Sequence, residues 1–79
     1  MDQASLEQAL LNAHAQNDTR ALIELYTIAG DQAEDARDDE AASFYLTHAF
    51  VFALEAGAPE APKLNIRLAN KGRAHLLEF

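Results

Sequence analysis

The chain has 79 residues, 49% of them hydrophobic, with 13 acidic and 6 basic side chains and a net charge of −7. This length allows one small domain, and the lack of cysteine excludes disulfides and cysteine-ligated metal sites. Net acidity of this size argues against binding to nucleic acids or anionic membranes, because both need a basic face. The first residues lack the basic and apolar parts of a signal peptide, so we expect a soluble, cytoplasmic protein.

Apolar residues at helical spacing predict four helices, at about residues 3–16, 18–36, 39–56 and 59–72. Asp2 and Ser5 are alternative caps for the first helix, Ser5 together with Gln8 as a capping box, and Asp18 is the cap of the second. No alternating strand pattern occurs along the chain. The predicted fold class is therefore all-α, a single domain of four antiparallel helices over residues 1–79.

The ends of the third and fourth helices also carry local signals. The acidic run 38–40 suits the first turn of the third helix, and Gly57 suits the position after its last turn. Pro59 fits the first position of the fourth helix, and Gly72 is a C-terminal signal. The residues from 72 to 79 then form an apolar tail.

The third helix is apolar on two faces. One stripe contains Ala42, Leu46, Ala49, Phe50, Ala53 and Leu54, and a second contains Phe44, Val51 and Phe52 around His48. An ordinary surface helix buries one stripe only. We therefore expect this helix to lie in the middle of a stack, covered from both sides.

Residues 26–54 resemble the tetratricopeptide repeat, a helical hairpin with large and small residues at fixed offsets. Its first-helix pattern is matched by Tyr26, Ala29, Gly30 and Ala33, and its second-helix pattern by Ala42, Leu46 and Ala49. The expected contacts between the two helices are made by Tyr26, Gly30, Ala42, Leu46 and Ala49. The sequence departs from the pattern at Ala33, where the repeat usually has an aromatic residue, and at Leu54, where it commonly has proline. The resemblance implies a surface for protein interaction, while an unrelated helical bundle stays the alternative.

An acidic cluster spans residues 31–40, with Arg37 as its one basic residue. A calcium loop does not fit, since the third and sixth positions counted from Asp31 are alanines. Asp31, Glu34 and Asp35 lie in the last turns of the second helix, where negative charge opposes the helix dipole. We take these three residues as candidate contacts for a basic partner; a solvated hairpin end is the alternative.

Sequence patterns for catalysis are missing. There is no cysteine, no serine in a nucleophile elbow, no glycine-rich phosphate loop and no metal-binding pair of histidines. We therefore predict no enzymatic activity, no catalytic residue, no cofactor and no metal. His48, between Phe44 and Phe52, is either a packed histidine or, together with Phe52, a contact for a partner.

These observations predict a non-catalytic protein-interaction module, a small adaptor or scaffold that binds a protein segment on a helical face. The alternative is an acidic regulator or inhibitor that binds a basic surface through the 31–40 cluster. A homodimer is also possible, because Lys63, Arg67 and Lys71 form one basic face of the fourth helix that can meet the acidic cluster of a neighbour. Leu76, Leu77 and Phe79 of the tail are candidates for covering the edge of the stack.

Overall fold

The computed structural model describes residues 1–72, and these residues contain four α-helices and no strand. The helices are α1 (Gln3–Ala15), α2 (Thr19–Asp35), α3 (Asp39–Ala56) and α4 (Ala61–Asn70). This confirms the all-α prediction, with each boundary within two residues of the expected one. No helix among the described residues is both long and apolar enough to cross a membrane. The predicted contacts of the tail lie outside the described residues.

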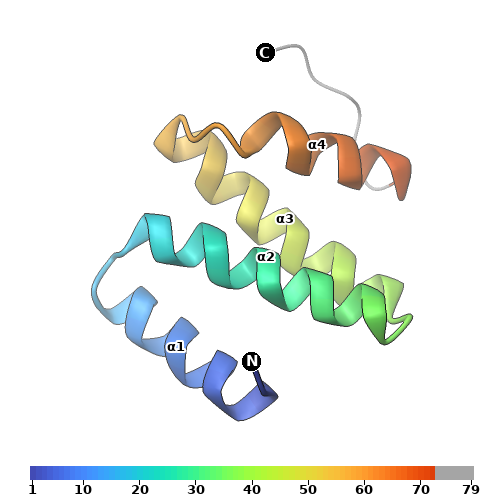
Figure 1. The fold of residues 1–79 in the computed structure, drawn as a ribbon. Helices are drawn as coiled ribbons and strands as arrows, with labels where there is room; N and C mark the ends of the chain where they lie inside the picture. Colours follow the sequence, from blue (N-terminus) through green and yellow to red (C-terminus); the bar gives the residue numbers. More distant parts are fainter. Residues whose placement is uncertain (73–79) are drawn as a thin grey trace.

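The helices follow one another as a folded ribbon, in which α1 packs on α2, α2 on α3 and α3 on α4 (Figure 1). The contact between α2 and α3 is by far the most extensive. The Cα atoms span 33 × 29 × 13 Å, so the helices form a thin layer. A helix in such a layer has neighbours on its flanks and keeps an outer face.

Three helices begin at an aspartate that accepts a hydrogen bond from the backbone N–H three residues later. Asp2 accepts from Ser5 at 2.7 Å, and Asp18 and Asp38 accept from Ala21 and Ala41 at 3.1 Å. Asp2 is thus the cap of α1, and the capping box of Ser5 and Gln8 is not formed. At the other end of α3, Gly57 adopts the left-handed conformation (φ 63°) that the sequence predicted for a helix stop.

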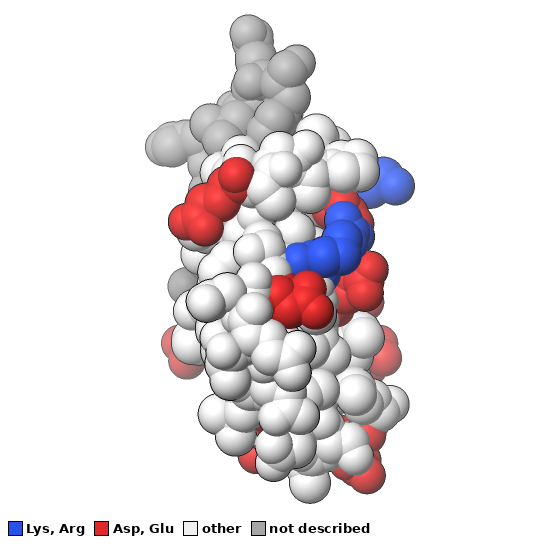
Figure 2. All heavy atoms as spheres, turned by 90° about the vertical axis from the view of Figure 1, so that its left-hand side faces the viewer, with Lys and Arg blue, Asp and Glu red and all other residues white. Residues whose placement is uncertain are grey.

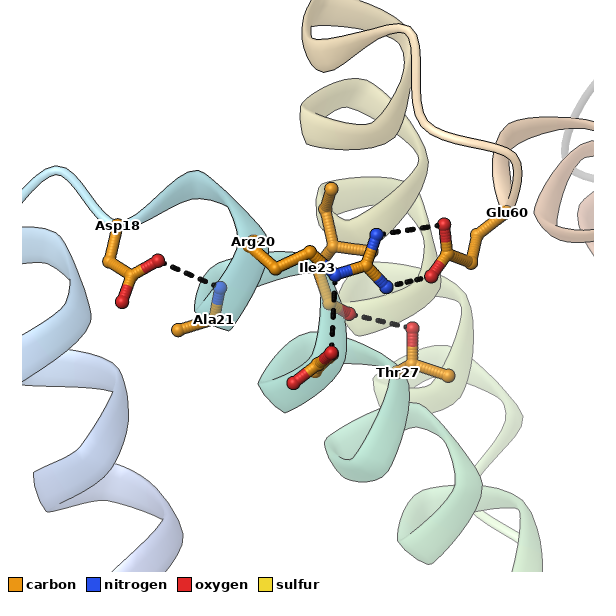
Figure 3. Close-up of polar contacts among 7 residues, drawn as sticks. Asp18, Arg20, Ala21, Ile23, Thr27 and Glu60 are labelled. Atoms are coloured by element: carbon orange, nitrogen blue, oxygen red, sulfur yellow. Dashed lines mark hydrogen bonds and ion pairs between the residues drawn. The ribbon is translucent and has the colours of Figure 1, made fainter.

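The start of α4 differs from the prediction. Pro59 lies in the turn before the helix, and Pro62 occupies its second position, where a missing N–H costs no intrahelical bond. Glu60 precedes the first residue of α4 and forms an ion pair with Arg20 of α2. Arg20 also contacts Glu24 at 3.1 Å, so its guanidinium joins the start of α2 to the turn that leads into α4 (Figure 3).

The main core lies between α2, α3 and α4. Its buried members are Ile23, Leu46, Ala49, Phe50, Ala53, Ala61, Leu64 and Leu68. Helix α1 lies on the other side of α2, and its buried residues are Leu6 and Ala13. Burying the five larger side chains of the main core, those other than the alanines, contributes about 1.5–3 kcal/mol each, which is the main stabilising term available to a chain without disulfides.

The prediction that both faces of α3 are covered is wrong. The first stripe is buried, except that Leu54 is 44% exposed. In the second stripe, Phe44 is 51% exposed and Val51 is 44% exposed, while His48 and Phe52 are half-buried. The reason is the single layer, because α2 and α4 occupy the flanks of α3 and no helix of the described chain lies over its outer face.

Gly30 of α2 lies directly against α3. A Cβ atom at this position would stand 2.6 Å from Cδ2 and 2.7 Å from Cγ of Leu46, and 3.6 Å from the carbonyl oxygen of Ala42. Ala42 and Leu46 are themselves fully buried. Gly30 therefore allows the two backbones to approach closely. Close packing of this kind occurs in many helical hairpins, so the resemblance to a tetratricopeptide repeat stays a prediction.

We expect Gly30→Leu and Ala42→Leu to lower the free energy of unfolding by about 1–3 kcal/mol, because the added atoms meet Leu46 or its neighbours. Gly30→Ala is also expected to destabilise, since the clash outweighs a gain in helix propensity of about 1 kcal/mol. Urea unfolding measures these differences. Ala4→Leu, on the exposed surface of α1, is the matched control and should stay within about 0.5 kcal/mol of the parent. Equal stability of Gly30→Leu and the parent would contradict the close contact.

Candidate functional site

Aromatic rings from three helices meet around Tyr26. Its ring stacks on His48 with 5.0 Å between ring centroids and an interplanar angle of 29°. It also stacks on Phe52 at 6.0 Å and 17°. Both partners come from α3, one helical turn apart, so the packing of α2 against α3 places Tyr26 beside both of them. Ring contacts of this geometry contribute about 0.5–1.5 kcal/mol beyond simple burial.

The Tyr26 hydroxyl connects this cluster to α1. Its oxygen lies 2.8 Å from Nε2 of His14, a hydrogen-bonding distance. Burial and, to a smaller extent, the neighbouring Tyr45 raise the pKa of Tyr26 above its ordinary value. The phenol therefore keeps its proton at neutral pH and holds α1 and α2 together without a charge.

His48 is held by its own helix. Its Nδ1 lies 2.8 Å from the carbonyl oxygen of Phe44, and a carbonyl can only accept, so Nδ1 carries the proton and donates it. The Phe44 and His48 rings also contact each other at 4.4 Å. In the neutral imidazole, Nε2 is then an acceptor. These contacts fix the ring at the middle of the outer face of α3.

We call the exposed and half-buried side chains of this outer face the α3 strip. It consists of Phe44, Thr47, His48, Val51 and Phe52. Two shallow depressions lie along it, one lined by Glu40, Ser43, Phe44, Thr47 and His48, the other by Thr47, His48, Val51 and Phe52. The strip is thus a continuous and largely apolar surface on one rigid helix.

Of the sequence-predicted partner contacts, His48 and Phe52 belong to the α3 strip. The sequence predicted Phe44 and Val51 to be covered, and the structure corrects this prediction because both are exposed on the strip. Thr47 was missed. Its spacing to these apolar residues, three positions after Phe44 and four before Val51, was a usable signal, but a threonine within an apolar stripe gives no indication of exposure.

The other predicted contacts, Asp31, Glu34 and Asp35, lie apart from the strip, at the end of α2. Arg67 of α4 contacts Asp31 at 2.6 Å and Glu34 at 2.5 Å. Lys71 contacts Glu34 at 2.8 Å. Two of the three carboxylates that oppose the dipole of α2, Asp31 and Glu34, are therefore compensated by cations at the end of α4.

These ion pairs shift pKa values in the expected directions. The hydrogen bond from Lys71, assisted by Arg67, lowers the pKa of Glu34 below its ordinary value, although partial burial acts in the opposite direction. For Arg67, burial favours the neutral form, but the hydrogen bonds to Asp31 and Glu34 dominate and raise its pKa. Arg67 and Lys71, two of the three cations on the predicted basic face of the fourth helix, thus form ion pairs within the chain. Lys63 forms no ion pair among residues 1–72.

The surface seen in Figure 2 shows the same pattern of charge. Basic atoms lie directly beside acidic atoms, other acidic groups have no base next to them on this face, and most of the visible surface is uncharged.

Within residues 1–72, no group of three or more His, Asp or Glu side chains has the geometry to hold a metal ion.

Comparisons with known proteins give no relative from which a function can be transferred: no family model, no curated protein and no solved structure matches this chain.

We expect Glu34→Gln to lower the free energy of unfolding at pH 7 by about 0.5–1 kcal/mol, because both cations lose their shared carboxylate. Since the folded-state pKa of Glu34 is lowered, the stabilisation is complete above the ordinary pKa of about 4.3 and is lost as the pH falls further. Thermal melts from pH 7 to pH 2.5 should show parent and variant converging at the acidic end.

Asp35→Asn is the matched control. Asp35 lies in the same last turn of α2, and no ion pair within the described residues involves it. Its replacement should leave the melt unchanged or slightly higher, because it removes only the unfavourable contact with the dipole. If the two variants behaved alike at pH 7, the pairing of α2 with α4 would contribute nothing to stability.

Proposed function

We propose that this protein is a non-catalytic interaction module, a small adaptor or scaffold, whose α3 strip binds a segment of another protein. The observation that supports the proposal best is the exposure of Phe44 and Val51 on a face that also contains His48 and Phe52. Contiguous apolar surface of this kind is typical of interaction sites, because water around it is released when a partner covers it.

The rigidity of the strip also supports binding. Its helix begins at the Asp38 cap, ends at Gly57 and is packed through Ala42, Leu46 and Ala49 against the core. The His48 and Phe52 rings are further held by Tyr26. A partner therefore meets side chains that are already ordered, which reduces the entropy lost on binding.

The resemblance to a tetratricopeptide repeat points to the same class of function. The alternative, an acidic regulator that binds a basic surface through residues 31–40, has less support. Asp31 and Glu34 are engaged by Arg67 and Lys71, and Asp38 is engaged as a cap. A basic partner would have to displace these contacts before gaining its own.

Affinity capture from the source cell with the full chain as bait tests this function. Val51→Glu places a charge in the middle of the strip and should abolish capture of partners that the parent retains. Ile66→Glu on α4 is the matched control, since Ile66 is also an exposed, β-branched apolar residue at 49% exposure. Both variants should fold as the parent does, because exposed glutamate is a good helix former.

Quantitative mass spectrometry reads the outcome. The proposal requires at least one protein that is enriched by the parent and by Ile66→Glu and is lost with Val51→Glu. Enrichment that is equal with all three baits would place the binding surface elsewhere on the molecule.

A further inference from the structure

We propose that the segment bound by the α3 strip is an amphipathic helix with a basic residue near each end of its apolar face, and not a second copy of this chain. This inference rests on the proposed function and specifies its partner. It follows from the arrangement of charge around the strip, from the hydrogen bonding of α3 and from the consequences of self-pairing.

Each end of the strip is marked by an exposed carboxylate. Glu40 lies one turn before Phe44, and Glu55 lies one turn after Val51. On a helical wheel both carboxylates fall within about 60° of these apolar residues, and they are about 22 Å apart along the axis. Within residues 1–72, neither Glu40 nor Glu55 forms an ion pair.

These two acids differ from Asp31 and Glu34 near the end of α2, which are already compensated by Arg67 and Lys71. The chain also has a net charge of −7. A partner with basic residues about 22 Å apart, on the same face as its apolar residues, would place a cation beside each carboxylate. The apolar contact supplies most of the affinity, and the charges select the partner.

The bound segment must form its backbone hydrogen bonds within itself. All the hydrogen bonds of a helix such as α3 run within it, so the strip offers no unpaired N–H or C=O groups to an extended peptide. A helix brings its backbone already paired and presents side chains at the spacing that the strip itself has. The acceptor Nε2 of His48, at the middle of the strip, can receive a hydrogen bond from one polar side chain of such a helix.

Repulsion between glutamates disfavours pairing of the α3 strips of two copies of this chain. If two copies of α3 packed antiparallel about a two-fold axis, Glu40 of each would approach Glu55 of the other. In a parallel pair, each glutamate would approach its own counterpart. Like charges meet at both ends in either case, and both subunits are acidic overall.

The test uses the full chain and three labelled 20-residue peptides with capped termini. All three have leucine at one helical face and alanine and glutamine elsewhere. The first carries arginine near both ends of the leucine face, the second has glutamate there, and the third has glutamine. Fluorescence anisotropy at low and high salt measures the affinity of each peptide for the parent and for three variants. These are Glu40→Gln/Glu55→Gln, Val51→Glu and, as a control that removes two acids away from the strip, Glu7→Gln/Asp35→Asn.

We expect the basic peptide to bind the parent more tightly than the acidic one and to lose about tenfold in affinity with Glu40→Gln/Glu55→Gln, corresponding to two exposed ion pairs. Glu7→Gln/Asp35→Asn should change the affinity much less, and Val51→Glu should abolish binding. High salt should reduce the difference between the basic and glutamine peptides.

Three results would overturn the inference. If all peptides bound equally and lost affinity only with Val51→Glu, the strip would be an interaction surface without charge selection, and the proposed function would survive alone. Binding that persisted with Val51→Glu would remove the strip from both proposals. If no peptide bound, and sedimentation equilibrium showed a dimer that Val51→Glu dissociates, the occupant would be a second copy.

Discussion

The close approach of α2 to α3 at Gly30 determines the arrangement of the rest of the molecule. With no side chain at position 30, Leu46 fills the space against the glycine, and α2 and α3 make the most extensive contact between helices of the described chain. This contact brings Tyr26 beside His48 and Phe52. A larger residue at position 30 would separate the helices and loosen the surface cluster together with the core.

A layer of four short helices cannot cover all of its apolar surface. A chain of this size buries only about 60% of the surface that it exposes when unfolded. The core between α2, α3 and α4 contains the apolar side chains of one face of α3, and the outer face keeps Phe44 and Val51 exposed to solvent. Incomplete burial and the candidate binding surface are therefore two consequences of the same architecture. A partner that covers this face would gain the free energy of burying its apolar surface.

The acidic residues that form ion pairs or cap helices are different from those that flank the α3 strip. Asp31 and Glu34 near the end of α2 would destabilise that helix by opposing its dipole, and Arg67 and Lys71 compensate them. Asp2, Asp18 and Asp38 stabilise helix starts. Glu40 and Glu55 form no ion pair within the described residues, and they flank the apolar strip. Glu40 also lies in the first turn of α3, where its charge interacts favourably with the helix dipole. Because exposed pairs contribute little energy but discriminate between partners, such acids are suited to selection more than to affinity.

The sequence alone determined the helices and much of their packing, because caps, glycine stops and apolar periodicity act over a few residues. Helices α2 and α3 begin at the caps Asp18 and Asp38, and α3 ends at Gly57, as the local chemistry of these residues requires. The small residues Gly30 and Ala42 indicated a close contact that the structure places at Leu46. Only the tertiary structure decided which face of α3 is covered, since both stripes are apolar and periodicity does not show which neighbours are present. It also decided that Glu34 pairs with Arg67, 33 positions later in the chain, because such a contact depends on how α2 and α4 both pack on α3 and leaves no local pattern in the sequence.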